Sequence, residues 1–433
     1  MFKGLAAIAG VFGLTCLFWA LSSPAETVAT SGEVSQLLGG LALTAFAMLF
    51  TIATRAGVLD GLFGGLDKAY VVHKWLGVVA IGLVLVHFVT HGGAGHDATG
   101  PGSRRQRGDG PLGGDGAQLA DGQLGDGPDR WGVAAMVAFV VLVAVALFAK
   151  KLSHETWKVV HKLMAVAYGV GLVHYYGASQ YRPWGTSPYS LWLNLVNLLG
   201  VAAALYAVLV YEHVAFRHEY QVTGLRQVGM NNLEVTASPT GRALVWRPGQ
   251  FTFVKFPRLG FGSHPFTIAT APDATTIQLA IRALGDHTAN LPGTLKVGDR
   301  LVTSAAHGRF DHTTGLPRQV WVAGGIGITP FRSFIQSGVP PQYCVDLFYS
   351  FNAGHGAYLD ELATTDNVRV HLVNTTEAGL LTAEQIAQTI APAGPVDVYF
   401  CGPRPMRDAL AHSLGASAVH VHRFHVEEFR FGR

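Results

Sequence analysis

The sequence is poor in charged residues and in cysteine. Only 14% of its 433 residues are Asp, Glu, Lys or Arg, against about 25% in an ordinary soluble protein. The net charge of +3 is small and no basic stripe runs along the chain, so nucleic acid is not an expected partner. The three cysteines, Cys16, Cys344 and Cys401, are too scattered for a disulfide framework or for a zinc or iron–sulfur site.

The chain is rich in long apolar runs, nearly all of them before residue 212. A helical run of this length crosses a hydrocarbon core about 30 Å thick. We expect six spans in membrane lipid, at residues 4–21, 34–54, 70–91, 131–149, 156–177 and 188–211. The first run also has the form of a cleaved signal peptide, but a first span leaves an even number of crossings.

Lysine and arginine favour one set of span ends, which predicts a multi-pass protein of the cytoplasmic membrane. This orientation puts both termini, and everything after residue 212, in the cytoplasm. On the outer side, residues 92–130 are expected to form a flexible loop. Residues 92–128 contain thirteen glycines and almost no large apolar side chains, so they bury too little surface to offset the entropy of ordering.

Two of the apolar runs each carry a pair of histidines: His73 with His87, and His161 with His174. At about 1.5 Å per residue, the members of a pair lie roughly 20 Å apart along a helix, so the four lie at two depths. Fourteen residues bring His87 back to within about 40° of His73 on an ideal helix. Thirteen residues leave His174 about 140° away from His161 on an ideal helix. The second helix must therefore depart from ideal geometry if both histidines are to face the first helix.

A bulge or kink at Gly169 or Gly171 would re-aim the second histidine of that helix. Neutral imidazole is a normal axial ligand of haem iron, and histidine inside a membrane usually marks function. The four histidines therefore predict two haems, one above the other. The alternative is that they form hydrogen bonds across helices or lie in the membrane interface.

After residue 217 the apolar pattern becomes short and alternating, as at 250–256, 277–281 and 300–303, which predicts an antiparallel barrel. From residue 319, strand-like runs alternate with helix-like ones, the rhythm of a parallel sheet. The strand-like runs are 320–323, 344–349, 368–372 and 397–401, and the helix-like runs are 330–336, 357–364, 382–390 and 406–414. The expected fold is a multi-domain membrane protein: a six-helix transmembrane bundle (1–212), an antiparallel β-barrel (213–316) and an α/β parallel-sheet domain (317–433).

Two motifs in the predicted barrel suit a flavin nucleotide. In the first motif, an aromatic ring can cover one face of the flavin while the neighbouring hydroxyl hydrogen-bonds the flavin ring nitrogens. In the second motif, an arginine with nearby amides and a hydroxyl suits a pyrophosphate. The residues are His264, Pro265, Phe266, Thr267, Arg282, Gly285 and Thr288. His264 alone is also compatible with a simple turn before proline.

Residues 320–330 have the pattern of a strand, a glycine turn and a helix start. Glycines let the backbone approach a phosphate, and a helix N-terminus offers free amides and a positive dipole end. Proline suits the first helical turn. The candidate nucleotide-binding residues are Gly324, Gly325, Gly327, Thr329 and Pro330.

Together, the six spans, the two histidine spacings and the trailing domains resemble the ferric reductase and NADPH oxidase flavocytochrome b family. The resemblance covers nearly the whole chain except the glycine-rich outer loop. It implies two haems b, held by His73 with His161 on the cytoplasmic side and by His87 with His174 on the outer side.

The flavin motifs, in their order, resemble the FAD domain of this family, and the last domain resembles ferredoxin-reductase-type nicotinamide domains. That resemblance implies a Cys-Gly-Pro turn near the nicotinamide. It also implies an aromatic near the C-terminus that stacks on the flavin until the nicotinamide displaces it, with an acidic residue assisting. The residues concerned are Cys401, Gly402, Pro403, Glu427 and Phe429, with Phe431 as the alternative to Phe429.

Family members that use NADPH carry an arginine after the second strand of this domain, where the present chain has residues 350–353 without one. A guanidinium is the natural partner of a 2′-phosphate. The absence of this arginine favours NADH over NADPH, unless Arg332 or Arg404 binds the 2′-phosphate instead.

The expected function is a transmembrane oxidoreductase that passes electrons from NAD(P)H through FAD and two haems b to an acceptor on the outer face. Ferric chelates are the first choice of acceptor and oxygen, giving superoxide, the second. His91 resembles a histidine near the oxygen-reducing site of oxidase members, but residues 34–50 lack their arginine. Tyr168 lies between the haem levels, as a bridge or as a packing aromatic.

Two other functions stay open from the sequence. One is a haem-bearing membrane subunit that delivers electrons to a partner protein or to a quinone. The other is a set of helices that merely anchors a flavin reductase and holds no haem.

Overall fold

The computed structural model divides the chain into two compact units. One contains Phe2–Ala56 and Val71–Tyr211, and the other contains Gly57–Tyr70 and Glu212–Arg433. The division after Tyr211 lies next to the predicted limit at residue 212, whereas the inclusion of Gly57–Tyr70 in the second unit was not expected. The structure describes residues 2–23, 31–94, 128–148, 152, 154–177, 183–260, 262–272, 275–283, 288–362, 365, 367–390 and 394–427.

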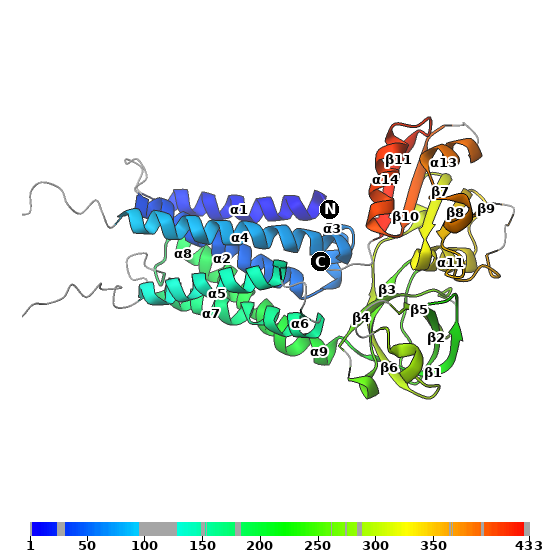
Figure 1. Ribbon diagram of the computed structural model, residues 1–433. Coiled ribbons are helices and arrows are strands. Elements are labelled where there is room, and N and C mark those ends of the chain that lie inside the picture. Colours follow the sequence, from blue (N-terminus) through cyan, green and yellow to red (C-terminus); the bar gives the residue numbers. More distant parts are fainter. Residues whose placement is uncertain are drawn as a thin grey trace, which may run out of the picture. The chain divides into compact units, whose positions relative to one another are not determined.

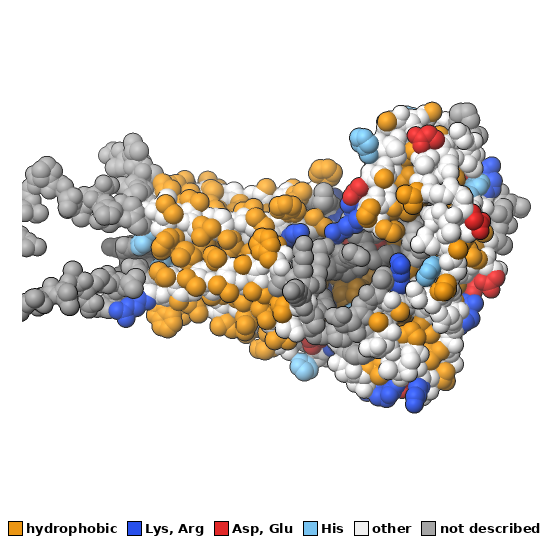
Figure 2. All heavy atoms as spheres, in the orientation of Figure 1, with side chains coloured by type: hydrophobic (Ala, Val, Ile, Leu, Met, Phe, Trp, Pro, Cys, Tyr) orange, Lys and Arg blue, Asp and Glu red, His pale blue; other side chains and the backbone are white. Residues whose placement is uncertain are grey.

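The first unit is a bundle of apolar helices that run alongside one another (Figure 1). Within the described residues, five of them (α1, α2, α4, α5 and α8) are long and apolar enough to cross a membrane, and apolar side chains cover their visible face (Figure 2). The helices are α1 (Phe2–Ser22), α2 (Ser31–Ala53), α4 (Leu66–Ala94), α5 (Pro128–Phe148), α6 (His154–Lys162), α7 (Met164–Gly177) and α8 (Pro188–Leu205). A π-helical turn, Tyr206–Val210, leads from α8 into α9 (Tyr211–Val214).

The fifth expected span, 156–177, is not one continuous helix, so the count of six spanning helices is not confirmed. It consists of α6 and α7, which are separated at Leu163, where the amide bonds the carbonyl of Val160 at 3.1 Å. This i→i−3 bond is tighter than that of an α-helix and changes the phase of the residues that follow. The break at Leu163 therefore re-aims His174, a change that was expected from a bulge or kink at Gly169 or Gly171. Helix α7 runs through both glycines without interruption.

Glycines let α2 pack closely against its neighbours. A Cβ on Gly40 would lie 2.9 Å from the ring carbon that carries the hydroxyl of Tyr189, and one on Gly200 would lie 2.7 Å from Cβ of Ala47. Small residues at helix contacts are the usual means of close packing in a membrane. Most of the predicted outer loop lies outside the described residues, but helices α4 and α5 continue into its two ends at residues 92–94 and 128–130.

The second unit holds a six-stranded antiparallel sheet of order β4-β3-β6-β1-β2-β5. Ile268, just after β4, forms a bridge with Leu279 in β5, so the curled sheet brings its two edges together. The predicted antiparallel domain is confirmed as a curled sheet around a core that includes Tyr220, Val235 and Leu301. Its strands are β1 (His218–Gln227), β2 (Asn232–Pro239), β3 (Phe251–Lys255), β4 (His264–Thr267), β5 (Ile277–Arg282) and β6 (Arg300–His307).

The rest of the second unit is built on a five-stranded parallel sheet of order β11-β10-β7-β8-β9, as predicted. Its central strands are buried on both faces, which explains their continuous apolar sequence. The strands are β7 (Arg318–Gly324), β8 (Cys344–Phe351), β9 (Val368–Asn374), β10 (Val396–Cys401) and β11 (Val421–Glu427). The helices of this unit are α3 (Gly57–Phe63), α10 (Leu291–Thr294), α11 (Thr329–Gln336), α12 (Thr375–Ala378), α13 (Ala383–Thr389) and α14 (Arg404–Gly415).

The structure of this domain differs from the expectation in two places: one strand was missed and one predicted helix is absent from its described residues. Strand β11 was not predicted, because it lies at the edge of the sheet and its partly exposed residues make no continuous apolar run. The described part of 357–364 forms turns rather than a helix. Tyr358 there has a φ of 59°, which no helix accommodates, and Glu361 is held by arginines of neighbouring elements.

Candidate functional site

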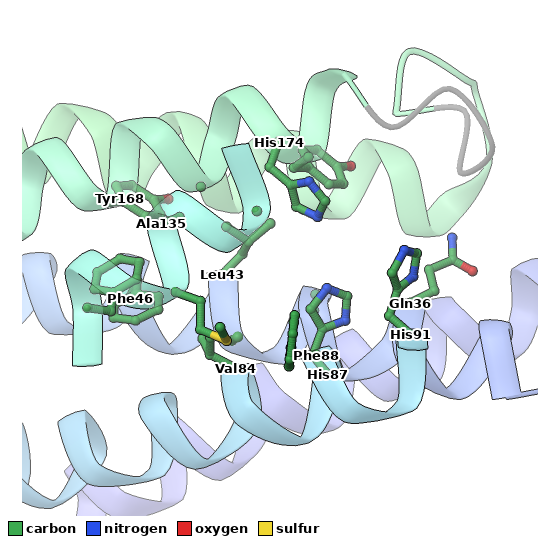
Figure 3. Close-up of a pocket in the computed structure, with 18 of the residues that line it drawn as sticks. Gln36, Leu43, Phe46, Val84, His87, Phe88, His91, Ala135, Tyr168 and His174 are labelled. Carbon is green, nitrogen blue, oxygen red and sulfur yellow. The ribbon is translucent and has the colours of Figure 1, made fainter. Parts of the chain in front are cut away.

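His87 on α4 and His174 on α7 point toward one another across a cavity (Figure 3). Their ring centres are 6.2 Å apart and the ring planes make an angle of 63°. Two nitrogen–iron bonds of about 2 Å, with about 1 Å from each nitrogen to its ring centre, place ring centres about 6 Å apart. The two rings therefore have the separation expected of histidines that share one iron.

The same arrangement recurs one level along α4. The rings of His73 on α4 and His161 on α6 are 6.1 Å apart, again at 63°. Trp157 stacks on His161 at 4.9 Å and 9°, which fixes the plane of that ring. Within the described residues, the buried Nδ1 atoms of His73 and His161 have no hydrogen-bond partner. Histidines that bonded each other directly would lie closer together, so the repeated separation favours metal ligation over cross-helix hydrogen bonding.

Ser35 on α2 sets the protonation of His87. Nδ1 of His87 lies 2.7 Å from the carbonyl oxygen of Ser35 and 3.0 Å from its hydroxyl. A carbonyl only accepts, so Nδ1 carries the proton and Nε2 keeps its lone pair for a metal. A partner of this kind also fixes the orientation of a ligating ring. Nothing in the sequence marks Ser35, which lies 52 residues away from His87.

The cavity between His87 and His174 has apolar walls and depends on two glycines. It holds about 1150 Å³ of space outside protein atoms, part of it open to the surroundings. A Cβ on Gly132 of α5 would lie 2.9 Å from the His174 ring, and one on Gly39 of α2 would lie 3.1 Å from the His87 ring. Apolar walls, this space and two opposed imidazoles fit a haem. The sequence marks neither glycine, because each matters only through a side chain from another helix.

If each histidine pair holds a haem, replacing Gly132 by alanine is expected to lower the haem bound between His87 and His174 while the haem between His73 and His161 stays. The new Cβ would stand within 2.9 Å of the His174 ring, which must turn away from His87. The ratio of b-type haem to protein in the purified chain measures the loss. Gly13→Ala is the control, because a Cβ there has nothing within 4 Å; an equal haem content in the two variants would contradict the assignment.

Polar and aromatic residues also line the cavity between His87 and His174. His91 lies beside Gln36 near the cavity (Figure 3), with its ring centre 6.1 Å from that of His87. Tyr168 is buried and its hydroxyl donates to Asn197 at 3.3 Å. It also lines the cavity, so it is a packed aromatic that faces the space between His87 and His174.

The flavin motif lies on β4, at one edge of the curled sheet. Phe266 and Thr267 pair with Thr252 and Phe251 of β3, which holds the motif in an extended strand. Within the described residues, the hydroxyl of Thr267 is buried and has no hydrogen-bond partner. Buried polar groups are nearly always bonded, so this hydroxyl suits a polar atom of a ligand. The same strand carries the other two residues of the motif, His264 and Pro265.

The structure brings the two predicted phosphate-binding motifs together. Arg282 ends β5, and its Nη1 atom would lie 3.9 Å from a Cβ on Gly325. Gly325 has a φ of 57°, in the left-handed region that glycine enters without strain. Thr288 is described in a turn after β5, whereas Gly285 lies outside the described residues.

The glycine turn after β7 packs directly on the Cys-Gly-Pro turn after β10. A Cβ on Gly324 would lie 2.7 Å from Cδ of Pro403, and one on Gly402 would lie 3.1 Å from Cα of Gly324. A Cβ on Gly327 would lie 2.6 Å from the carbonyl carbon of Cys401 and would overlap its oxygen. Helix α11 then begins at Thr329, with Pro330 in its first turn, as predicted.

Cys401 and Glu427 lie opposite each other on β10 and β11. Both are buried, and burial raises the pKa of each well above its ordinary value, helped by neighbouring carboxyl groups. Burial therefore favours the protonated form of both the thiol and the carboxyl group. Within the described residues, Oε2 of Glu427 has no hydrogen-bond partner. Phe429 and its alternative, Phe431, lie outside the described residues.

Arg332 is not free to bind a 2′-phosphate. It is only 5% exposed, and its guanidinium bonds Glu361 at 2.6 Å and the carbonyl of Ala269 at 2.9 Å. The other candidate, Arg404, is exposed at the first residue of α14.

Comparison with known families matches three successive parts of the chain. Residues 38–172 match the ferric reductase like transmembrane component. Residues 218–311 match an FAD-binding domain, and residues 321–412 match the oxidoreductase NAD-binding domain. The matches follow the order of the helical bundle, the curled sheet and the parallel sheet.

Individual relatives match parts of the chain. The ferredoxin reductase component of 3-ketosteroid-9-alpha-monooxygenase from Mycobacterium tuberculosis is 29% identical over 201 residues, 44% of this chain and 56% of that protein. NADPH oxidase 1 of Rattus norvegicus is 33% identical over 113 residues, 25% of this chain and 18% of that protein. Among solved structures, an intact type IV self-sufficient cytochrome P450 monooxygenase is 25% identical with a TM-score of 0.41, covering 49% of this chain and 28% of that one. The chain spans about half the length of the curated relatives that it matches first.

Proposed function

Because the chain belongs to the ferric reductase and NADPH oxidase-like oxidoreductases, with FAD- and NAD-binding domains, we propose that it carries electrons from NAD(P)H across a membrane to an acceptor on the far side. The observation that carries this proposal is the repeated histidine pair. Two pairs with ring centres 6.1 and 6.2 Å apart, both at 63°, lie at two levels of one apolar bundle. Such an arrangement makes a path for electrons through lipid.

Each group of residues would hold one cofactor. His73 with His161, and His87 with His174, would each ligate a haem b. Strand β4 with Arg282 would hold FAD, and the two packed glycine turns would hold the nicotinamide nucleotide. When bound, FAD supplies the exchange between a hydride and single electrons, and the haems supply one-electron iron centres. The chain supplies ligands, orientation and an apolar cavity between His87 and His174.

The proposed orientation has six crossings, with α6 and α7 together making the fifth. The distribution of lysine and arginine supports a cytoplasmic position for the curled and parallel sheets, in a cytoplasmic membrane. Electrons then pass outward, first to the level of His73 and then to the level of His87.

We propose ferric chelates as the acceptor, with oxygen as the second choice. Superoxide is an anion, and a nearby cation would favour its formation. Among the described residues that line this apolar cavity there is no lysine or arginine, and the polar residues that line it include His91 and Gln36. NADH is the proposed donor, because residues 350–353 contain no arginine and Arg332 is committed to other partners.

A reduced-minus-oxidised spectrum of membranes containing the protein tests the proposal. NADH is expected to produce a b-type haem band equivalent to two haems per chain. Intact cells are then expected to reduce ferric chelates faster than oxygen. Flavin absorbance without a haem band would leave only a membrane-anchored flavin reductase. Haem reduction without any outer-face activity would favour delivery of electrons to a partner protein or quinone.

A further inference from the structure

Four charged side chains form a compact cluster where the curled sheet meets the parallel-sheet domain. Arg226 of β1 bonds Glu234 of β2 at 3.0 Å and also pairs with Glu361. Arg332 of α11 bonds Glu361 at 2.6 Å and lies 3.8 Å from Glu234. We call these residues the arginine–glutamate cluster; two positive charges balance two negative ones. The ring of Tyr358 covers it, 4.3 Å from the guanidinium carbon of Arg332.

Arg332 is the member that touches most partners. Besides the glutamates, its Nη1 atom donates to the carbonyl of Ala269 at 2.9 Å and to Oε1 of Gln278 at 2.8 Å. Burial raises the pKa of Glu361, but the bonds from Arg226 and Arg332 outweigh this and hold the pKa below its ordinary value. The carboxylate therefore stays charged. A planar guanidinium with donors in several directions is suited to this position, whereas a lysine ammonium is a point charge.

Arg332 links the two sites that must meet during hydride transfer. Arg332 lies three residues after Thr329, in the helix that begins at the glycine turn. Ala269 lies two residues after Thr267, the last residue of the candidate flavin strand. Next to Arg332, the hydroxyl of Ser333 donates to the carbonyl of Thr270 at 2.8 Å. One turn of α11 thus holds the backbone that continues from the flavin strand.

The cluster also holds the loop that follows β8. In open α/β sheets, ligands bind beyond the carboxyl ends of the strands, and this loop is at such an end. Glu361 ties the far end of the loop to both arginines. At its near end, the carbonyl of Gly354 accepts from the amide of Met230 at 2.8 Å, which belongs to the turn between β1 and β2.

We propose that Arg332 is a positioning residue, which holds the nicotinamide-binding turn and the loop after β8 against the flavin-binding strand and so sets the approach of the two nucleotides. The inference rests on the proposed function of these sites. Arg332 touches neither nucleotide in this account and acts through the backbone that binds them. A small misplacement of two reacting groups lowers the rate of their reaction by roughly a hundredfold.

The test is Arg332→Lys in the full-length chain, purified with FAD bound and reduced by NADH in a stopped-flow instrument. The limiting rate of flavin bleaching per bound FAD is expected to fall roughly 10- to 100-fold, with a smaller change in the NADH concentration that gives half the limiting rate. Arg258→Lys is the matched control. Arg258 also makes two bonds to a carboxylate, at 2.7 Å each to Asp299. It is exposed, and its guanidinium bonds Asp299 and the carbonyl of Thr294 rather than residues of either motif.

Three readouts separate the outcomes. A lower melting temperature with an unchanged limiting rate per bound FAD would mean a purely structural role and would overturn the proposal. If Arg332→Lys does not retain FAD, Glu361→Gln replaces it; this variant removes one charge of the cluster and is expected to show a smaller fall in the same rate. An unchanged rate in Glu361→Gln would also count against the proposal. Wild-type protein that NADH fails to reduce would instead refute the proposed function.

Discussion

Replacing His161 by alanine is expected to remove one of the two haems and to reduce electron transfer from NADH to outer acceptors to the background of membranes without the protein. His73 would then face a methyl group instead of a ring 6.1 Å away. A single imidazole cannot supply both axial ligands of a six-coordinate haem. The outer pair, at the level of His87, would keep its haem but lose its electron supply. Electron transfer over the resulting gap is expected to be negligible.

Three measurements check this expectation. The haem-to-protein ratio of the purified variant should fall to half, and the NADH-reduced haem band should vanish while dithionite still reduces the remaining haem. Dyes that accept electrons directly from flavin should be reduced at the wild-type rate, because the second unit is unchanged. His213→Ala is the control, since His213 is an exposed histidine in the short helix α9. Full haem content in the His161 variant would show that this residue is not a ligand.

The positions of the four histidines were predictable because helical spacing is a local property. Counting residues gave two levels and the correct face of α4 for His73 and His87. The same count failed for His161 and His174, and the structure supplies the reason. A helix break at Leu163 changes the phase, and such a break depends on packing between helices rather than on a glycine nearby.

What supports the ligands could not be read from the sequence. The carbonyl that fixes the protonation of His87 belongs to Ser35, and a backbone carbonyl exists at every position. Gly132 matters only because the ring of His174 lies against it. Contacts of this kind form only when separate helices pack together, so no local sequence motif predicts them.

In the nucleotide motifs, too, the local backbone was predictable and the tertiary contacts of side chains were not. The glycine turn was recognisable because left-handed backbone and a close helix start demand particular residues over a short stretch. Arg332, only a few residues later, was considered as a phosphate ligand, and its side chain instead joins Glu361 and Ala269. Local sequence identified the backbone turn that is suited to bind the nucleotide. The partners of a long charged side chain depend instead on the tertiary fold.

Replacing Gly327 by alanine is expected to abolish rapid flavin reduction by NADH while both haem sites remain intact. The added Cβ would lie 2.6 Å from the carbonyl carbon of Cys401 and would overlap its oxygen. Both groups are backbone, so neither can rotate away. The turn after β7 must separate from the Cys-Gly-Pro turn, at a cost of about 1–3 kcal/mol in unfolding free energy.

Because these two turns together form the candidate nicotinamide site, their separation should slow flavin bleaching by NADH on the order of a hundredfold. Gly415→Ala is the matched control in the same domain: a Cβ there has nothing within 4 Å, and alanine favours the helix that it ends. Dithionite should give the wild-type haem spectrum in both variants, since the helical bundle is untouched. If Gly327→Ala and Gly415→Ala bleach at the same rate, the nicotinamide does not bind where the two turns meet. Loss of the haem band in Gly327→Ala would mean instead that the substitution disturbs the whole chain.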